Sequence, residues 1–301
     1  MISFENVSKF ILSDISIHVP EGETVGLIGA SGAGKTTFMK LACGLLTPER
    51  GTVYTMGFKP VQERKRLSKN MSVLFTDIPA LQAEDTVAGN FEILQRIYGI
   101  DRKQFQADYK ELAKRLGFAA FENQAVKNLS MGQRRRAEIG GVLIRRPKLL
   151  LLDEPTDGLD ENAKQAFYEL LEERKREGLT VLLTSHNMAE ISRVCGRIVL
   201  VDRGKLLYYG KEQQLRKKFA PIDKMWLVLE GKIPDLEDLP IVRYWVDGNR
   251  LGLEYNSNYV TASEILKLIM GQTTVMEVKV RKPDLEDIII RLKTEKEEKM
   301  L

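Results

Sequence analysis

The chain has 301 residues, which is enough for one large hydrophobic core and a smaller second domain. Its 46 basic and 42 acidic residues leave a net charge of only +4 and are scattered, so we expect no nucleic-acid partner. No run approaches the roughly 18 to 20 apolar residues that cross a bilayer, and the start lacks a signal-peptide pattern, so we expect neither a membrane span nor secretion. The two cysteines, Cys43 and Cys195, are expected to be buried thiols.

Short alternating or apolar runs over 2–7, 12–19 and 24–28 predict three strands at the start of the chain. Phe10 is the notable aromatic residue between the first two runs. Its ring could stack on an adenine base through its π face, or it could be ordinary core, and both interpretations remain open at this point.

A phosphate-binding loop is predicted where Gly-x4-Gly-Lys-Thr follows the third strand. Its glycines allow turns in which successive backbone N–H groups converge on an anion. Lys35 is predicted to reach the β- and γ-phosphates and Thr36 to place its hydroxyl on Mg²⁺, while the helix that starts near Lys35 directs its positive end at the same charge. The residues predicted to bind the nucleotide are Gly29, Ala30, Ser31, Gly32, Ala33, Gly34, Lys35, Thr36 and Thr37.

The helix after this loop is predicted to extend over 38–46, and short strands are predicted at 52–57 and 71–75. From Val87 to Tyr98 apolar residues recur at helical spacing after a plausible cap at Asp85-Thr86, and such a stripe is more often core than interface. A second helix over 102–116 is charged on one side. Together these helices predict an insertion, about 77–145, between strands of the sheet.

The sequence Leu129-Ser130-Met131-Gly132-Gln133 precedes a helix with a basic start. Ser130 and Gly132 at a helix N-terminus could open the backbone to a phosphate group. A plain N-cap explains Ser130 about as well.

An apolar strand follows and ends in two adjacent acids, Asp153 and Glu154. Because side chains alternate along a strand, we expect the two carboxylates to point in opposite directions. One carboxylate can then hold the Mg²⁺ shell while the other faces the γ-phosphate and an attacking water, and nucleotide hydrolysis needs both.

The segment after these acids turns into a helix over 161–177, for which Asp160 is the expected cap. A buried strand over 179–185 then ends at His186. Ligands of open α/β sheets bind at the carboxyl ends of parallel strands, so this position favours a role for His186 in the nucleotide site.

Beyond a hairpin at 198–209 the composition changes, and we expect a small α+β domain over 221–301 after a first domain over 1–215. A turn is expected at Asp247-Gly248-Asn249. The remaining expected elements are strands at 225–230, 241–246, 250–255 and 274–280, a helix at 262–270, and a charged helix from Asp284 whose end, 293–301, is expected to fray.

With these motifs in their order and spacing, residues 1–215 resemble the ATP-binding subunit of an ABC transporter. The amino-acid sequences of segments 129–138, 146–156 and 185–188 are most similar to those of the exporter branch called ABC-2. The resemblance implies an α/β fold of the P-loop NTPase class, with a mixed sheet core, an antiparallel β edge and a helical insertion. The tail at 282–290 is similar to that of exporter ATPases in the same branch.

The resemblance also implies a mechanism in which two such domains close head to tail and a membrane permease converts closing and opening into transport. That arrangement implies a peripheral position at the cytoplasmic face of the cell membrane, with the stripe 87–98 where the family docks its permease. ATP would lie between the phosphate loop of one copy and Ser130, Gly132 and Gln133 of the other. The implied roles are catalysis for Glu154, a γ-phosphate contact for His186, Mg²⁺ ordering for Asp153 and communication across the dimer for Asp160.

Two positions depart from the family pattern. The family places a glutamine after the strand 71–75 as a Mg²⁺ ligand, and the corresponding residue here is Asp77. An acid can still bind Mg²⁺ but adds negative charge beside phosphate, so we expect slower ATP hydrolysis. The segment around Phe10 is shorter than usual, which leaves the adenine-stacking role open.

Two other functions deserve comparison. Soluble ABC proteins that act on ribosomes or DNA usually carry tandem ATPase domains or coiled-coil insertions, whereas this chain has one phosphate loop and neither insertion. A regulatory nucleotide-binding subunit with little turnover is favoured by Asp77 and opposed by Glu154. Importer ATPases often end in an oligonucleotide-fold-like barrel, so a mixed α+β tail favours export.

Overall fold

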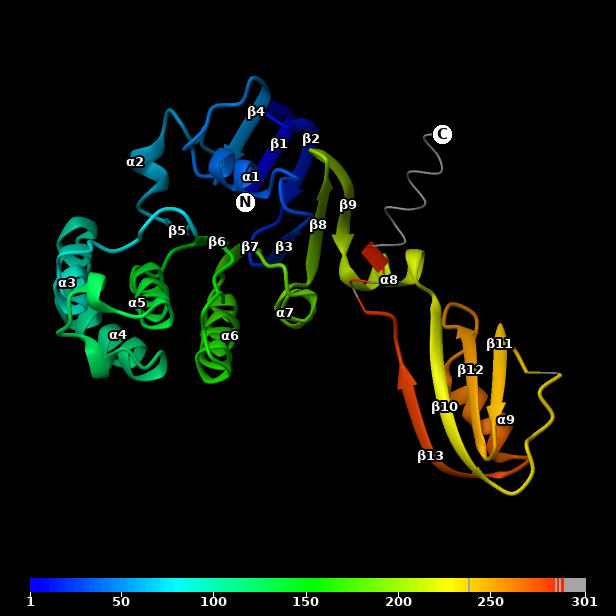
Figure 1. Cartoon of the computed structure of the whole chain (residues 1–301). Helices are drawn as coiled ribbons and strands as arrows, with labels where there is room; N and C mark the ends of the chain where they lie inside the picture. The colour runs from blue at the N-terminus through cyan, green and yellow to red at the C-terminus, as the bar shows by residue number, and fades with distance from the viewer. Residues whose placement is uncertain (238, 285, 287, 290–301) are drawn as a thin grey trace. The chain divides into compact units, whose positions relative to one another are not determined.

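The computed structural model of this protein describes residues 1–237, 239–284, 286, 288 and 289, and Figure 1 traces them along the chain. Contacts divide the chain into two compact units, with the division after Gly210. Helix α8 (Glu212–Phe219), which the sequence did not predict, belongs to the second unit. Within the part of the chain that the structure describes, no helix is both long and apolar enough to cross a bilayer.

A six-stranded sheet forms the centre of the first unit, in the order β5-β6-β7-β3-β8-β9 (Figure 1). Four neighbouring pairs, from β5 to β8, run parallel. Every residue of β3, β6 and β7 is buried, as expected where helices cover both faces of a parallel sheet. The strands are β3 (Thr24–Ile28), β5 (Met71–Leu74), β6 (Leu149–Asp153), β7 (Thr180–Thr184), β8 (Arg197–Asp202) and β9 (Lys205–Lys211).

A separate antiparallel sheet joins β1 (Ile2–Lys9), β2 (Leu12–Val19) and β4 (Arg50–Thr55) in the order β2-β1-β4. Helix α1 (Lys35–Ala42) packs on it, since the rings of Phe4 and Phe38 stack with centroids 4.1 Å apart. The mixed architecture with an antiparallel edge is therefore confirmed. Helix α1 ends earlier than the expected residue 46, because Gly44 has a left-handed φ of 75°.

Helices α3, α4 and α5 form the insertion that follows β5, and Figure 1 shows them clustered together. Their shared core includes Phe91 of α3, Tyr109 of α4 and Phe118, whose ring centroids lie 5.1–5.8 Å apart. Thr86 caps α3 as predicted, because its hydroxyl accepts the Gly89 N–H at 3.0 Å. The helices of this region are α2 (Arg64–Leu67), α3 (Val87–Tyr98), α4 (Arg102–Arg115) and α5 (Met131–Leu143), with 3₁₀ turns at Ala119–Phe121 and Val126–Asn128.

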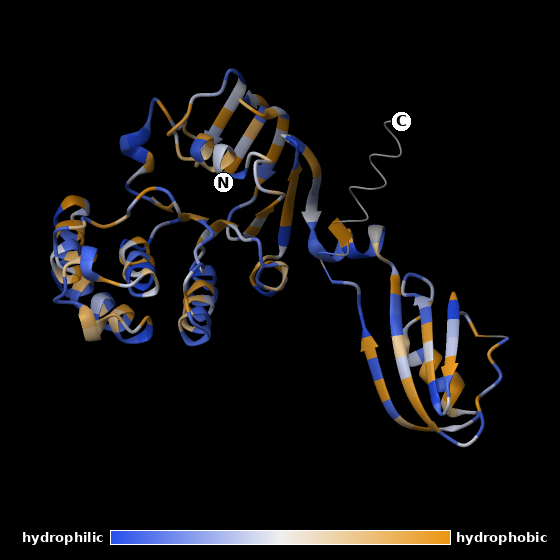
Figure 2. Ribbon diagram, viewed as in Figure 1, coloured by the Kyte–Doolittle hydropathy of each residue, from blue (hydrophilic) through white to orange (hydrophobic). Residues whose placement is uncertain are grey.

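Helices α6 (Glu161–Arg176) and α7 (Met188–Val194) complete the first unit. Helix α7 lies close to β3 at Gly26, where an added Cβ would be 3.0 Å from Ile191 and 3.2 Å from the Cys195 sulfur. Figure 2 shows hydrophobic residues along β8 and mainly hydrophilic residues along α6, which is the division expected for a core strand and a surface helix. Both cysteines are buried thiols, as predicted.

The second unit contains a four-stranded antiparallel sheet in the order β11-β12-β10-β13, with α9 (Ala262–Met270) packed on one face. Its core joins Met225, Leu227 and Leu229 to Ile265 and Ile269. The strands are β10 (Ile222–Glu230), β11 (Arg243–Asp247), β12 (Arg250–Asn256) and β13 (Thr274–Arg281), close to the ranges that alternation predicted. The charged helix expected from Asp284 and the frayed end at 293–301 lie almost entirely outside the described residues.

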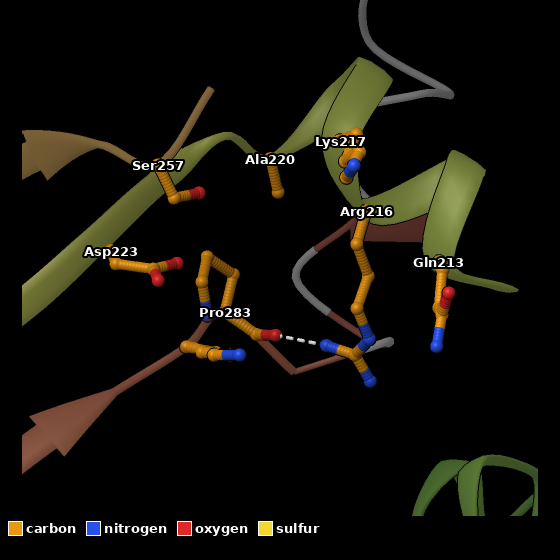
Figure 3. Close-up of a pocket in the computed structure, with 8 residues that line it drawn as sticks. Gln213, Arg216, Lys217, Ala220, Asp223, Ser257 and Pro283 are labelled. Atoms are coloured by element: carbon orange, nitrogen blue, oxygen red, sulfur yellow. Dashed lines mark hydrogen bonds between the residues drawn. The ribbon is translucent and has the colours of Figure 1, made fainter. Parts of the chain in front are cut away.

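A pocket in the second unit is lined by one buried acid, Asp223, and by three basic side chains (Figure 3). Asp223 is 5% exposed, and its backbone belongs to the β10–β12 ladder, whereas its carboxylate makes no hydrogen bond or ion pair with a described residue. Burial raises the pKa of its carboxyl, although the charges of Lys282 and Arg216 act in the opposite direction. The residues lining the pocket are Gln213, Arg216, Lys217, Ala220, Asp223, Ser257, Lys282 and Pro283.

Replacing Asp223 by Asn should stabilise the second unit at neutral pH. The pKa of Asp223 is higher in the folded state than its ordinary value of 3.8, so its negative charge lowers the free energy of unfolding. This loss of stability is absent below pH 3.8, where the carboxyl is protonated in both states, and complete above the folded-state pKa. Asn keeps the shape without the charge, so the free energy of unfolding at pH 7 should rise by about 0.5–1 kcal/mol.

Urea unfolding followed by tryptophan fluorescence measures this change, because both tryptophans of the chain, Trp226 and Trp245, lie in the second unit. The gain should shrink as the pH falls toward 3.8. A lower urea midpoint for Asp223→Asn at pH 7 would show that the charge of Asp223 stabilises the unit instead.

Candidate functional site

The carboxyl ends of β3, β6 and β7 meet at one edge of the sheet because these strands are parallel neighbours. Residues 29–34 connect β3 to α1, and residues 35–37 form the first turn of α1. Glu154 follows β6, and His186 lies two residues beyond β7. The topology thus brings the predicted phosphate loop, the two acids and the histidine to the same edge.

The phosphate loop is held by its lysine and depends on the glycines at positions 29 and 34. An added Cβ on Gly29 would lie 2.2 Å from the Val201 carbonyl oxygen. The Lys35 ammonium donates to the carbonyl oxygens of Gly29 at 2.9 Å and Ala30 at 3.2 Å. Gly34 has a left-handed φ of 108°, and an added Cβ would lie 2.5 Å from a methyl group of Leu12. A side chain at position 34 would therefore strain the loop and displace the β1–β2 turn.

Phe10 lies in that turn, between β1 and β2, and next to Ile11, which also contacts Gly34. Its side chain is 68% exposed, and the Lys9 ammonium lies 4.6 Å from its ring centroid. The interpretation of Phe10 as ordinary core is therefore wrong. Adenine stacking by this exposed ring remains a prediction.

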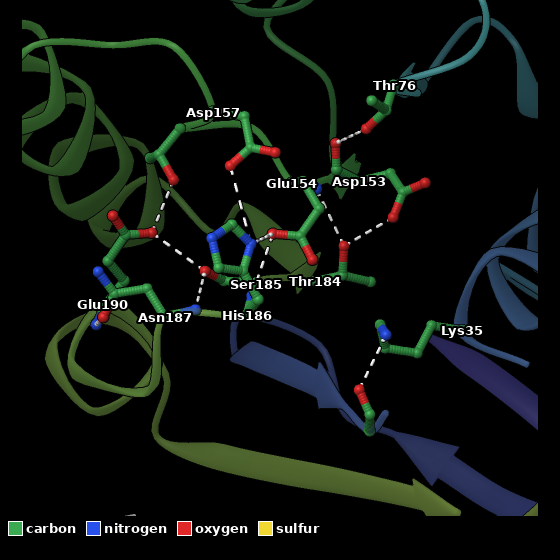
Figure 4. A network of polar contacts seen from close by, with 12 residues as sticks. Lys35, Thr76, Asp153, Glu154, Asp157, Thr184, Ser185, His186, Asn187 and Glu190 are labelled. Carbon is green, nitrogen blue, oxygen red and sulfur yellow. Dashed lines mark hydrogen bonds and ion pairs between the residues drawn. The ribbon is translucent and has the colours of Figure 1, made fainter. Parts of the chain in front are cut away.

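Asp153 is buried and surrounded by threonine hydroxyls (Figure 4). The Thr36 hydroxyl lies 3.3 Å from Oδ2 of Asp153, and the Thr184 hydroxyl donates to Oδ1 at 2.7 Å. Thr76 donates to the Asp153 backbone carbonyl at 3.0 Å. A carboxylate beside a hydroxyl on a helix start is a hard oxygen donor set, which fits Mg²⁺.

Glu154 turns away from Asp153 because it leaves the strand with a left-handed φ of 46°. Strand alternation was the expected cause of this divergence, but β6 ends at Asp153 and the turn produces it instead. Both the His186 N–H, at 3.1 Å, and the His186 Nδ1, at 3.0 Å, contact Oε2 of Glu154. Figure 4 shows the two side chains directed toward one another.

Burial raises the pKa of the Glu154 carboxyl. The backbone and side chain of His186 oppose this effect by hydrogen bonding to the carboxylate, while the negative charge of Asp157 adds to it. The His186 side chain is 73% exposed, and its Nδ1 lies 3.8 Å from Oδ1 of Asp157. A half-buried carboxylate beside an exposed histidine is an arrangement that can accept a proton from water.

Ser130 caps α5 through a capping box. Its hydroxyl accepts the Gln133 N–H at 3.2 Å, and the Gln133 side-chain oxygen accepts the Ser130 N–H at 2.9 Å. The N-cap interpretation of Ser130 is confirmed. Its contact with a phosphate of another copy remains a prediction.

Gly132 fixes the start of α5 against the loop that precedes α6. An added Cβ on Gly132 would lie 2.5 Å from the Gly158 carbonyl oxygen. In the same region Arg136 forms an ion pair with Asp160, and Asp160 caps α6 by accepting the Ala163 N–H at 2.9 Å, as predicted. Residues 129–133, which we call the signature segment, and the 157–160 loop therefore form one packed structure.

Asp77 is exposed and pairs with Lys40 of α1, one turn beyond Thr36, at 2.9 Å. The hydrogen bond and charge of Lys40 lower the pKa of the Asp77 carboxyl. Sequence reasoning missed Lys40, Thr76 and Thr184 as neighbours of the site. Thr184 is the register partner of Asp153, and strand register was the missing information.

Comparison with known proteins identifies the family. The ABC transporter family model matches residues 12–157. ABC transporter ATP-binding protein NatA of Bacillus subtilis is 33% identical over 214 residues, which cover 70% of this chain and 87% of the relative. The chain belongs to the ABC transporter ATP-binding family. As an ABC ATPase subunit, it binds and hydrolyses ATP.

A second relative of this ABC subunit is similar along both units, and a similar protein has been solved as a dimer. Nod factor export ATP-binding protein I of Rhizobium etli is 31% identical over 299 residues, which cover 97% of this chain and 92% of the relative. A bacterial ABC transporter cassette solved as a dimer is 25% identical with a TM-score of 0.64, over 70% of this chain and 98% of that chain. The predicted family and P-loop fold are thus confirmed.

Replacing Gly132 by Ala should slow ATP hydrolysis. The new methyl group would push α5 away from the Gly158 carbonyl and shift the signature segment, and misplacement by about 1 Å can cost about 100-fold in rate. We expect a loss of about 10- to 100-fold in steady-state ATPase assays. Gly196→Ala is the matched control, because nothing lies within 4 Å of the added Cβ, and equal rates for the two variants would contradict this account.

Proposed function

We propose that this ABC ATPase powers an ABC-2 type exporter through ATP-driven closure of two ATPase subunits. The observation that carries the proposal is similarity along both units to an export ATP-binding protein, which this chain matches over 97% of its length. The alternative of a soluble ABC protein acting on ribosomes or DNA receives no comparable support.

In the proposed reaction, the loop 29–37 cradles the phosphates of ATP with its backbone N–H groups. The Lys35 ammonium, which is hydrogen-bonded to two carbonyl oxygens of the loop, would turn to the β- and γ-phosphates. Thr36 and Asp153 would hold Mg²⁺, which neutralises charge on the phosphates when bound. Phe10 would stack on the adenine from the neighbouring turn.

Glu154 would accept the proton of the attacking water. Its raised pKa suits this step, because a base with a pKa closer to neutrality takes a proton more readily. His186 would orient Glu154 through the 3.0 Å contact and touch the γ-phosphate with the exposed part of its ring. These two side chains are therefore the proposed catalytic residues.

Each site would be completed by a second subunit, either an identical copy or a related chain. Ser130, Gly132 and Gln133 of the partner would cover the γ-phosphate, and Asp160 would relay the state of one site to the other. The similar cassette solved as a dimer supports this arrangement. The close packing of Gly132 on Gly158 supports it too, because it joins the signature segment to the Asp160 loop within each copy.

A transmembrane permease would dock on the exposed part of α3 and hold the subunit at the cytoplasmic face of the membrane. Val87 and Phe91 of the apolar stripe are buried in the insertion core, whereas Ile97 is 67% exposed. Tyr98 is half-exposed, and the Arg145 guanidinium lies 3.4 Å from its ring centroid. The stripe thus divides into a core part and an accessible part suited to a partner.

Purification of the tagged chain from detergent-solubilised membranes tests the proposal. A membrane protein with several spans should co-purify with the wild-type chain, and Ile97→Asp should abolish this capture while leaving ATP binding intact, because Ile97 lies at the surface. Recovery of the wild-type chain with ribosomes, or equal capture by both forms, would contradict it.

Replacing Asp77 by Gln should raise the ATPase rate by about 2- to 5-fold, equivalent to about 0.4–1 kcal/mol of barrier. The substitution removes a negative charge near the Mg²⁺ and phosphate site while keeping an oxygen ligand at similar reach. Asp77→Asn is the matched variant, since it removes the charge but shortens the side chain. An unchanged rate and unchanged Mg²⁺ dependence for Asp77→Gln would rule out a role for Asp77 in the site.

A further inference from the structure

Glu190 is a buried carboxylate near the proposed catalytic pair, and Figure 4 shows it on the opposite side of His186 from Glu154. It lies in the first turn of α7 and is 9% exposed. Its Oε2 accepts hydrogen bonds from the Thr156 hydroxyl at 2.6 Å and the Ser185 hydroxyl at 3.1 Å, and its Oε1 pairs with the Lys164 ammonium at 2.9 Å. Both carboxylate oxygens therefore bond to side chains that lie outside α7.

The partners of Glu190 lie next to the catalytic residues in sequence. Thr156 follows Glu154 by two residues, and Ser185 directly precedes His186. One carboxylate thus connects the loop after β6 to the loop after β7. Ser185 is held from a second direction as well, since its hydroxyl accepts the Asn187 N–H at 3.0 Å.

A role limited to stabilising α7 does not account for this arrangement. An acid in the first turn of a helix interacts favourably with the helix dipole while fully exposed to solvent. Asn187 already caps α7 by accepting the Ala189 N–H at 3.0 Å. Burial of Glu190 with two hydroxyls and a lysine from other elements instead produces a cross-link between the two loops.

We propose that Glu190 is a positioning residue for ATP hydrolysis, which sets the Glu154–His186 contact by fixing the loops that carry both residues. The inference rests on the proposed catalytic roles of Glu154 and His186. Glu190 acts through these two residues, since its carboxylate bonds to Thr156, Ser185 and Lys164 and not to Glu154 or His186. Loss of the cross-link should let the loops drift apart, and small displacements of catalytic groups are costly in rate.

The first test is steady-state ATP hydrolysis by the full chain carrying Glu190→Ala. We expect kcat to fall about 10- to 100-fold, with KM for ATP changed by less than about twofold, because the phosphate loop is untouched. Glu190→Gln should recover much of the rate, since its amide oxygen can still accept from Thr156 and Ser185. Equal losses for the Ala and Gln variants would contradict the proposal.

Glu161→Gln is the matched control. The Glu161 carboxylate lies 3.7 Å from the same Lys164 ammonium, but its side chain is 91% exposed. We expect an unchanged rate for this variant. If it slowed hydrolysis as much as Glu190→Ala, the effect would belong to Lys164 and the cross-link would be excluded as its cause.

A double-mutant cycle separates positioning from general destabilisation. His186→Ala removes the side-chain part of the contact that Glu190 sets and leaves only the backbone N–H, so adding Glu190→Ala in that background should reduce kcat by less than it does in the wild-type background. The same fold-loss in both backgrounds would overturn the proposal. A lowered melting temperature with unchanged kcat for Glu190→Ala would also overturn it, and Glu190→Gln provides the cycle if the Ala variant does not fold.

Failure of the proposed function gives a different result. If Glu154→Gln and His186→Ala hydrolyse ATP at the wild-type rate, the proposed catalytic roles are wrong, whatever Glu190 does. If these variants are slow and Glu190→Ala is not, only the positioning role of Glu190 is wrong.

Discussion

The hydroxyl of Thr184 joins the two acidic residues on which the site depends. It donates to the Asp153 carboxylate at 2.7 Å and accepts the Glu154 N–H at 2.9 Å. This junction exists because β6 and β7 are parallel neighbours in which Asp153 and Thr184 are register partners. The threonine hydroxyl therefore satisfies the buried Asp153 carboxylate and the backbone of the following turn together, and a buried polar group left without a partner would be costly.

The consequences of this junction extend to both sides of the site. On one side, Asp153 is held facing Thr36 at the start of α1, which gives the phosphate loop and the Mg²⁺ ligands a common position. On the other side, the left-handed turn at Glu154 directs its carboxylate to His186, and Glu190 connects the two loops that carry these residues. Asp153 and Glu154, which are adjacent in sequence, thereby face different partners at the same edge of the sheet.

Much of the fold could be predicted from sequence because local patterns specify it. Helices α3 and α9 have the expected bounds, since each has a threonine cap and apolar residues at helical spacing. The short helix α7 was missed because seven residues give too little periodicity, and α8 because Lys and Arg residues obscure its apolar face. Phe10 could not be assigned to surface or core, because exposure of a turn residue depends on tertiary packing.

The residues of the site were predicted better than the contacts between them. Lys35, Thr36, Asp153, Glu154 and His186 stand out in the sequence because their motifs have fixed spacing. The Asp77–Lys40 ion pair and the hydrogen bonds from Thr184 to Asp153 and from Thr156 to Glu190 join residues 31 to 37 positions apart in sequence. Such pairs follow from strand order and register, which spacing along one sequence does not reveal.

We propose that this chain holds half of each ATP site and that a second copy or a related chain completes it. Size-exclusion chromatography of Glu154→Gln, with and without ATP and Mg²⁺, tests this most directly. We expect a monomer without nucleotide and a stable dimer with ATP, because binding is retained while hydrolysis, which reopens the dimer, is blocked. A chain that binds ATP but elutes only as a monomer would contradict head-to-tail closure of the isolated subunit.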